Sequence, residues 1–277
     1  MPSVQANIQA PGPDYDAIKV KQQATWGSGD YGRVGITLQL TGEELCEAMD
    51  LRAGAKVLDV AGGNGNASLA AARRFCNVVS SDYVQGLLDQ SRARAQAEGL
   101  AIDYQLADAE ALPFADASFD HVVSTFGVMF APNQPRAAAE LRRVCRPGGS
   151  IGLANWTPDG FVGRLLKTVG RHVPPPAGVS SPTLWGTDAF ITEQYAGKAS
   201  RIDVNRKQFV FRYRSPEHFL QVFRDYYGPV HKAFSVLDDA QQDALSRDIH
   251  LLIAEFNRAD GGSMIVPSDY LEVVVTR

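Results

Sequence analysis

The chain has 277 residues, of which 45% are hydrophobic, and a formal net charge of −4. This length suits one large domain, or one domain with a substantial insertion, and the apolar content is enough for a full core. Arginine and lysine form only short pairs, which disfavours a nucleic-acid surface, because such surfaces need a basic stripe. No charged leader precedes an apolar segment, and no apolar run approaches the roughly 18 residues of a membrane span. We therefore expect a soluble, cytoplasmic protein.

The cysteines and histidines give no sign of a metal centre. Cys46, Cys76 and Cys145 occur singly within apolar patterns, and the five histidines are scattered. We expect each cysteine to be a small buried hydrophobic residue, and the odd number fits a reducing compartment. The sequence predicts no metal.

The N-terminal part predicts a tail followed by helices. Residues 1–13 contain three prolines and a glycine, which is typical of a flexible tail. Residues 14–26 predict a helix that the glycine-rich segment 27–32 closes. Thr41 precedes Glu44 by three residues, as in a capping box, and predicts a helix that runs from there to about Leu51.

Strands and helices then alternate. Four strand–helix–strand crossovers of this length predict a parallel sheet with right-handed connections, hence a doubly wound α/β fold. The fourth strand is almost continuously apolar, as a strand buried on both faces should be. The predicted strands are 57–61, 77–81, 102–107, 119–125 and 150–156, and the predicted helices are 66–74, 84–98 and 135–144.

The pattern changes after residue 156. Residues 157–200 contain several prolines, glycines and large aromatic residues, and a connection this long is usually a functional lid or has its own small elements. Alternating apolar residues from Arg201 predict a half-exposed strand, followed by helices at 216–227 and 239–258 and a final strand at 271–275. We divide the single domain into a tail and helical cap (1–50), a ligand-binding core (51–156), a lid (157–200) and C-terminal elements that complete the sheet (201–277).

Carboxylates follow three successive predicted strands. Asp59 lies at the end of the first strand, before the turn Gly62-Gly63-Asn64-Gly65; Asp82 and Asp108 follow the second and third strands. The carboxyl ends of parallel strands are where open α/β sheets bind ligands. An acid-lined nucleotide site suits a cationic ligand, and S-adenosylmethionine is one, with its sulfonium and its ammonium.

Each of these acids has a structural alternative. Asp59 would favour an ammonium but would be repelled by the pyrophosphate of a dinucleotide, although it could instead bond the amides of the turn. Asp82, 19 residues after Gly63, could accept both hydroxyls of a ribose or cap the helix that begins near Val84. Asp108 could accept from an adenine amine or cap a short turn. Ser68 stands at the third glycine position of the dinucleotide motif, a further mark against that ligand.

With these residues in place, the chain resembles the class I S-adenosylmethionine-dependent methyltransferases of the ubiquinone/menaquinone-biosynthesis-like group (methyltransferase type 11). The resemblance runs from about residue 50 to 156 and rests on Asp59 to Gly65, Asp82, Asp108-Ala109, Leu112-Pro113-Phe114 and Arg146 to Gly149. One departure is Ala61, where the family usually has glycine; alanine fits there provided that its φ angle is negative.

The resemblance implies a seven-stranded sheet whose last strand is antiparallel, and an N-terminal segment that closes over the cofactor. It implies methyl transfer from S-adenosylmethionine, with S-adenosylhomocysteine as product, and the aromatic content of the expected pocket suggests a small, partly apolar or planar acceptor. The acceptor pocket is expected between Asn155, Trp156, the lid and the N-terminal cap. The implied cofactor contacts are Tyr31, Asp59, Ala61, Gly63, Asn64, Gly65, Asp82, Tyr83, Leu87, Asp108, Ala109, Glu110, Thr125 and Phe126, with Trp26 as a further candidate.

Two alternatives stay open from the sequence: a protein that binds the cofactor without catalysis, and an NAD-dependent oxidoreductase with the same sheet. No residue is identified as catalytic. His172, before the proline run, is the best candidate for a general base, although a helix-end histidine more often packs or caps.

Overall fold

A seven-stranded sheet forms the centre of the molecule, with the strand order β3-β2-β1-β4-β5-β7-β6. The first five strands pair in parallel, and β7 runs antiparallel to both β5 and β6. The computed structural model describes residues 12–277. The strands are β1 (Lys56–Val60), β2 (Asn77–Asp82), β3 (Asp103–Leu106), β4 (Phe119–Thr125), β5 (Cys145–Trp156), β6 (Arg201–Tyr213) and β7 (Met264–Thr276). This confirms the predicted doubly wound, mostly parallel sheet with an antiparallel last strand.

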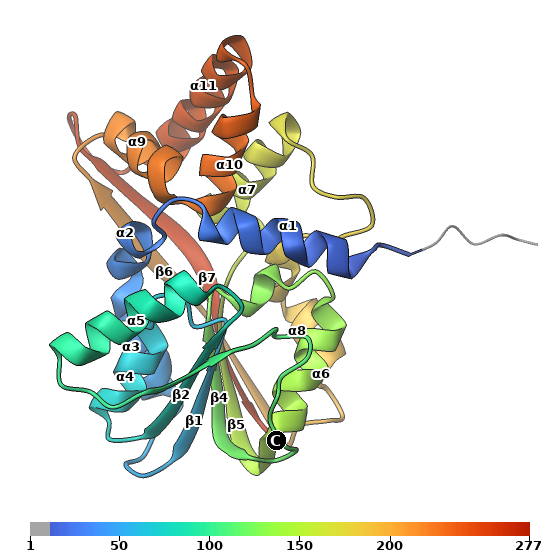
Figure 1. Ribbon diagram of the computed structural model, residues 1–277. Coiled ribbons are helices and arrows are strands. Elements are labelled where there is room, and N and C mark those ends of the chain that lie inside the picture. Colours follow the sequence, from blue (N-terminus) through green and yellow to red (C-terminus); the bar gives the residue numbers. More distant parts are fainter. Residues whose placement is uncertain (1–11) are drawn as a thin grey trace, which may run out of the picture.

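Helices cover both faces of this sheet (Figure 1). One face carries α3 (Gln39–Ala48), α4 (Asn66–Arg73) and α5 (Gln85–Ala97), and the other carries α6 (Gln134–Val144) and α8 (Asp188–Tyr195). The alanines of α4 are fully buried, so this helix can lie close to the strands. All three cysteines are buried and unpaired, as predicted.

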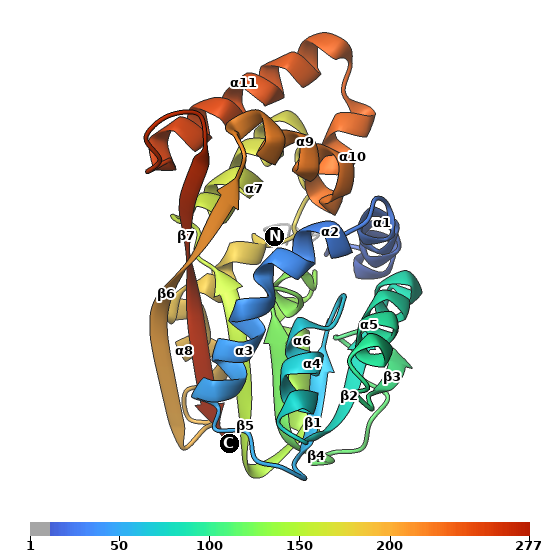
Figure 2. The same cartoon turned by 90° about the vertical axis from the view of Figure 1, so that its left-hand side faces the viewer.

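The remaining helices form a cap beyond the carboxyl ends of the parallel strands (Figures 1 and 2). β6 and β7, each 13 residues long, extend past the rest of the sheet and support this cap. The cap consists of α1 (Tyr15–Gly27), α2 (Gly32–Gly35), α7 (Phe161–His172), α9 (Pro216–Tyr226), α10 (Gly228–Val236) and α11 (Asp239–Phe256). In the part of the chain described, no helix is long and apolar enough to cross a membrane.

Two predictions for the helices were wrong. Thr41 does not cap a helix, because the chain is already helical before it: α3 begins at Gln39 and ends at Ala48, and the Thr41 hydroxyl donates to the carbonyl of Leu38 (2.6 Å). Helix α10 was not predicted, since Gly228-Pro229 resembles a break, whereas proline in the first turn is favourable for a helix. The predicted tail lies outside the described residues except for Gly12 and Pro13.

The segment 157–200 has its own elements and does not form one lid. Helix α7 belongs to the cap, where Phe161 is fully buried, whereas the 3₁₀ helix Pro182–Gly186 and α8 lie on the sheet face next to α6. Trp185 and Tyr195 are fully buried there. Aromatic residues that suggested a pocket wall therefore belong largely to the core.

This placement predicts the hydrogen-exchange behaviour of α8. Because Ile191 and Tyr195 are fully buried, amides of residues 188–195 should exchange slowly without any ligand. Helix α1, which lies on the outside of the cap, should exchange faster. Mass spectrometry of exchanged peptides measures both. Fast exchange in 188–195 that slows only when a ligand is added would restore the original lid prediction.

Candidate functional site

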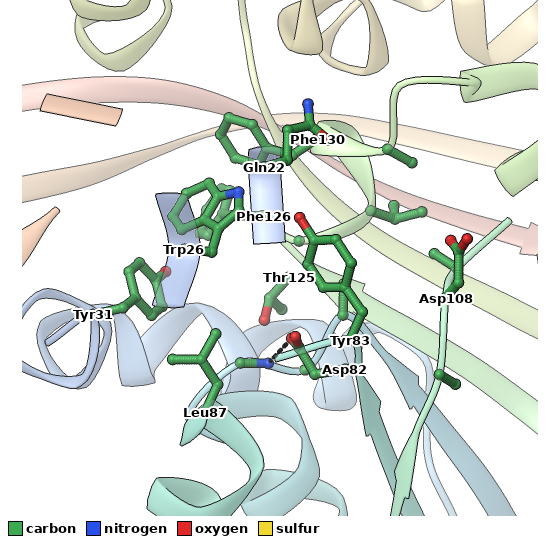
Figure 3. A pocket seen from close by; sticks show the side chains of 18 of the residues that line it. Gln22, Trp26, Tyr31, Asp82, Tyr83, Leu87, Asp108, Thr125, Phe126 and Phe130 are labelled. Carbon is green, nitrogen blue, oxygen red and sulfur yellow. Dashed lines mark hydrogen bonds between the residues drawn. The ribbon is translucent and has the colours of Figure 1, made fainter. Parts of the chain in front are cut away.

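A cavity opens at the carboxyl ends of β1, β2 and β4, with residues of α1 in its wall (Figure 3). Cavities in this position of α/β proteins typically hold nucleotide ligands. Eleven of the fourteen predicted contact residues line it: Tyr31, Ala61, Gly63, Asn64, Asp82, Tyr83, Leu87, Asp108, Ala109, Thr125 and Phe126. Asp59, Gly65 and Glu110 do not.

The turn after β1 has an unusual backbone. Ala61, Gly63 and Gly65 all have positive φ angles, of 52°, 57° and 90°. The sequence analysis required a negative φ angle for Ala61, and this expectation is wrong. The alanine adopts the left-handed conformation that favours glycine, at a cost of roughly 1 kcal/mol. The strain lies at the cavity wall, next to the residues expected to bind the ligand.

The glycines of the turn differ in what surrounds them. A Cβ on Gly63 would meet only the Tyr31 ring, 3.6 Å away, so this backbone faces the cavity. A Cβ on Gly65 would lie 2.1 Å from the Ser91 hydroxyl of α5. Gly65 is therefore required for packing between the turn and α5, and the prediction that it contacts the ligand is not supported by its position.

Asp82 holds this turn in place (Figure 3). One carboxylate oxygen accepts from the Gly63 amide (3.0 Å) and the other from the Val84 amide at the start of α5 (2.9 Å). Burial raises the pKa of Asp82 to about 6, although the amides of Val84 and Gly63 oppose the shift. The structural alternative for Asp82 is thus real, and the same carboxylate also lines the cavity.

Asp59 lies behind the turn. Its carboxylate accepts from the Ser68 hydroxyl (2.6 Å), which also contacts the Ser80 hydroxyl (2.9 Å). Asp59 is fully buried, and burial raises its pKa to about 7 in spite of the Ser68 hydrogen bonds. A Cβ on Gly62 would lie 2.9 Å from the Asp59 carboxylate, so the turn separates Asp59 from the cavity. The prediction of a direct contact between Asp59 and a ligand is not supported by this geometry.

Asp108 already has two partners. Its carboxylate accepts from the Glu110 amide (2.9 Å), which is the predicted turn cap, and from the Lys19 ammonium of α1 (2.9 Å). Lys19 also lies 3.4 Å from Glu110, which is buried and turned away from the cavity. Burial lowers the pKa of Lys19, but its hydrogen bonds to Asp108 and Asp16 outweigh this and raise it overall. Lys19 is therefore a permanent cation that ties α1 to the end of β3.

Helix α1 forms a wall of the cavity, and of its lining residues only Trp26 was a candidate from the sequence. Lys19, Gln22 and Trp26 line the cavity. The side-chain amide of Gln23 donates to the Tyr83 carbonyl (2.5 Å) and so ties α1 to the end of β2. A helical pattern shows that a helix forms but not which surface it will cover. The other lining residues that were missed are Gly62, Asn66, Ala107, Gly127, Val128, Phe130, Ala131 and Pro132.

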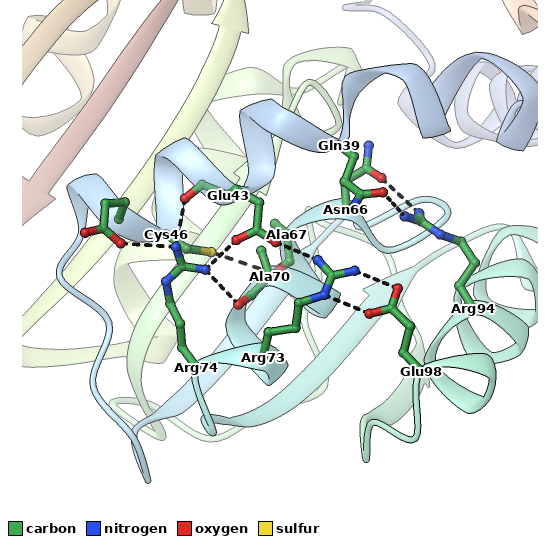
Figure 4. Close-up of polar contacts among 11 residues, drawn as sticks. Gln39, Glu43, Cys46, Asn66, Ala67, Ala70, Arg73, Arg74, Arg94 and Glu98 are labelled. Carbon is green, nitrogen blue, oxygen red and sulfur yellow. Dashed lines mark hydrogen bonds and ion pairs between the residues drawn. The ribbon is translucent and has the colours of Figure 1, made fainter.

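Arg94 of α5 supports the turn from its outer side (Figure 4). Its guanidinium donates to the Asn64 carbonyl (2.7 Å) and to the Asn66 side chain (2.9 Å). Asn66 in turn donates to the Gly35 carbonyl (2.7 Å). The turn is thereby connected to α5 and to α2, and its shape does not depend on a ligand.

A second, smaller cavity adjoins the first on the cap side. The two share Trp26, Tyr31, Phe126 and Phe130. The second, which we call the aromatic cavity, is lined in addition by Val34, Leu38, Trp156, Val162, Phe211, Phe223 and Tyr227. Its walls are apolar apart from two tyrosine hydroxyls and the indole N–H groups.

Phe126 is one of the four residues that line both cavities. It follows β4 directly and has a φ of 56°, a conformation that is strained for a bulky residue. Its amide donates to the Ala154 carbonyl (2.8 Å), and its ring stacks on Trp156 at 3.9 Å and 6°. These contacts hold the strained backbone in one position. Strain of this kind is concentrated at functional sites.

Only some of the residues expected at an acceptor pocket line the aromatic cavity. Trp156 and the N-terminal cap line the aromatic cavity, but Val162 is the only residue of 157–200 that does so among those described, and Asn155 does not. His172 lies elsewhere: its imidazole pairs with Asp248 of α11 at 2.9 Å, and it lines neither cavity. This position gives no support to the suggestion that His172 acts as a general base. Residues 12–277 contain no cluster of side chains suited to a metal ion.

The geometry of the turn predicts different effects for two glycine substitutions. Gly63→Ala adds only backbone strain and should lower the free energy of unfolding by about 1 kcal/mol. Gly65→Ala adds an overlap with Ser91 as well and should lower it by at least about 2 kcal/mol. Urea unfolding measures both.

Gly86→Ala is the matched control. Gly86 lies in α5, and a Cβ there would meet nothing within 4 Å, so this change should stabilise the protein by up to about 1 kcal/mol. If Gly63→Ala and Gly65→Ala destabilised the protein equally, the described packing of Gly65 on α5 would be incorrect.

Comparisons with known proteins agree with this site. A family described as a methyltransferase domain matches residues 58–153. An uncharacterized protein of Mycobacterium bovis is 37% identical over 247 residues, which cover 88% of this chain and 90% of that protein. The demethylmenaquinone methyltransferase of Deinococcus radiodurans is 36% identical over 127 residues, or 44% of this chain and 53% of that one.

The fold has a counterpart among solved structures. Phosphoethanolamine N-methyltransferase 2 of Haemonchus contortus, in complex with phosphomonomethylethanolamine and S-adenosylhomocysteine, has a TM-score of 0.54 at 16% identity, with 86% of this chain and 52% of that chain covered. The glycine turn, the carboxylates at the strand ends and these relatives lead to one assignment. The chain belongs to the class I S-adenosylmethionine-dependent methyltransferases.

Proposed function

We propose that this protein transfers the methyl group of S-adenosylmethionine to a small, partly apolar or planar acceptor that binds in the aromatic cavity. The observation that carries the proposal is that an acid-lined cavity adjoins an aromatic one, and that four residues, Phe126 among them, line both. Because the chain belongs to a methyltransferase family, we no longer consider the alternative of an NAD-dependent oxidoreductase.

The residues of the first cavity fit the cofactor. Asp82 is a buried carboxylate with lone pairs left for the two hydroxyls of a ribose, and Asp108 can accept from an adenine amine in addition to Lys19. The Gly63 backbone permits close approach because a side chain is absent there. Tyr83 and Leu87 supply apolar contacts from the β2–α5 side. Asp59 would act through the turn, by holding Ser68 and the start of α4.

Methyl transfer requires mainly that the acceptor is aligned with the methyl group. Bound S-adenosylmethionine would supply a methyl group already activated by a sulfonium, so the protein has to position the acceptor and exclude water. The aromatic cavity suits both tasks, since Trp26, Phe130 and Tyr227 pack edge to face around it. Of the residues described, none that lines the aromatic cavity is His, Asp, Glu, Lys or Arg, so we assign no general base.

Two acceptor types among the relatives mark the range to be tested. One relative is named for a menaquinone precursor, and a structural neighbour holds a phosphorylated amine. The aromatic cavity offers no cation for a phosphate. The apolar, planar type therefore agrees better with this chain.

Calorimetry tests the cofactor half of the proposal. S-adenosylmethionine and S-adenosylhomocysteine should both bind, and NAD should not. Turnover is then screened by the formation of S-adenosylhomocysteine with quinols, catechols, amines and fatty acyl compounds. Binding without turnover on any class would favour a non-catalytic role, and binding of NAD alone would overturn the proposal.

The raised pKa of Asp82 predicts a pH-dependent affinity. Only the ionised carboxylate accepts two hydroxyl hydrogen bonds, so affinity for S-adenosylhomocysteine should be constant above about pH 7 and fall as the pH drops through about 6. At pH 5 the loss should approach tenfold, because about one tenth of a group with a pKa of 6 is then ionised.

Asp82→Asn is the matched variant for this measurement, since it cannot ionise but retains an oxygen for the Gly63 amide. It should bind at least about tenfold more weakly at pH 7.5 and show a much flatter profile. Asp82→Ala would be less informative, because the loss of the Gly63 and Val84 contacts also lowers stability. A full pH dependence in Asp82→Asn would assign the titration to another group, such as Asp59.

A further inference from the structure

The polar groups of the aromatic cavity are two tyrosine hydroxyls and the indole N–H groups of Trp26 and Trp156. Tyr31, next to α2, lines both cavities, and Tyr227, between α9 and α10, lines the aromatic one. Their ring centroids are 6.4 Å apart, and each ring lies 5.7 Å from that of Trp26. In Figure 3 the Tyr31 hydroxyl is directed toward the interior of the pocket.

Neither hydroxyl has a hydrogen-bond partner among residues 12–277. The buried hydroxyls of Tyr195 and Tyr213 also have no partner there, but neither residue lines either cavity. Tyr31 and Tyr227 differ from these because they stand on neighbouring rings in the wall of the aromatic cavity, where a bound molecule could accept from both hydroxyls.

The chemistry of the walls restricts that molecule. Burial raises the pKa of Tyr31 to about 12 and raises that of Tyr227 further, so both phenols stay protonated and can donate. The described lining has no side chain that could neutralise a phosphate, an ammonium or a carboxylate. A ligand that fits is planar and apolar, and its one polar feature is an oxygen that accepts hydrogen bonds.

We propose that Tyr31 and Tyr227 form a pair of donors that selects an acceptor with a phenol-type or enol-type oxygen on a planar apolar skeleton. The inference rests on the proposed function, because it takes the aromatic cavity as the acceptor site. The tyrosines are specificity-determining residues in this account: they bond the oxygen, and the cavity walls fix the plane of the ring that carries it.

A pair of isosteric probes tests this selection. 2-Naphthol and 2-methylnaphthalene have nearly the same shape and differ by a hydroxyl in place of a methyl group. Their affinities are measured by calorimetry or fluorescence for the full chain saturated with S-adenosylhomocysteine, and again without it. The wild-type protein should bind 2-naphthol at least about fivefold more tightly than 2-methylnaphthalene.

Tyr31→Phe and Tyr227→Phe should each reduce this preference, and the double variant should abolish it while its affinity for 2-methylnaphthalene stays within about twofold. The preference is the ratio of the two probe affinities, both measured at saturating S-adenosylhomocysteine. A change in the affinity for S-adenosylhomocysteine therefore does not alter this ratio. Tyr226→Phe is the matched control, because Tyr226 precedes Tyr227 but lines neither cavity. It should retain the full preference.

Melting temperatures separate this role from a structural one. Since the two hydroxyls have no protein partner, their removal should leave the melting temperature unchanged or slightly higher; a clear drop in both variants would indicate a structural role and contradict the inference. Equal affinity for the two probes, no affinity for either, or a preference that survives in the double variant would overturn it. If S-adenosylhomocysteine failed to bind the wild-type protein, the proposed function would fail instead.

Discussion

The hydrogen bond from the Gly63 amide to the buried Asp82 carboxylate is the contact around which the site is arranged. It joins the turn after β1 to the end of β2 and leaves the backbone of Gly63 facing the cavity. The same carboxylate accepts from Val84 and so sets the start of α5. A single buried acid therefore fixes two adjacent strand ends and one helix, and burial raises its pKa because these amides only partly replace water.

The turn is stabilised on its other sides as well. Asp59 and Ser68 support it from below, and Arg94 holds the Asn64 carbonyl from outside. Preorganisation of this kind has an energetic consequence: the positive φ angle of Ala61 persists because the surrounding contacts leave the backbone no relaxed alternative. A ligand would meet a site that is already formed, and less binding energy would be lost in ordering it.

Helix α1 couples the two cavities. Lys19 near its start contacts Asp108 at one end of the acid-lined cavity, and Trp26 near its end forms a wall of both cavities. One short helix thus touches the expected adenine end of the cofactor and the expected acceptor. Its position over the site follows from tertiary contacts of a few side chains, including the bond from Gln23 to the Tyr83 carbonyl.

Local patterns in the sequence were sufficient for the core of the fold. The alternation of short apolar runs with helical ones predicted β1 to β4 to within one residue at each end, and β5 except for its first five residues. The signal is clearest for strands that are buried on both faces. Acids at strand ends could be placed at one edge of the sheet by topology alone, and Asp82 and Asp108 do line the cavity there. The same reasoning could not tell that the side chain of Asp59 points under the turn, since that depends on whether Ser68 or a ligand is its partner.

What the sequence could not supply were contacts between distant segments. Lys19 and Gln22 are ordinary residues of a weakly amphipathic helix, and only the packing of α1 places them at the cavity. Trp185 and Tyr195 suggested a binding surface, yet they fill the core beside α6, because a large aromatic side chain serves either purpose. The position of His172 could not be foreseen either, because its partner Asp248 is 76 residues away in the sequence.

A crystal structure of the protein with S-adenosylhomocysteine tests the central claim most directly. The account predicts that both ribose hydroxyls lie within hydrogen-bond distance of Asp82, that the adenine lies beside Asp108, and that the sulfur faces Phe126 and the aromatic cavity. A ligand whose ribose is bound away from Asp82, or whose sulfur points away from the aromatic cavity, would contradict it.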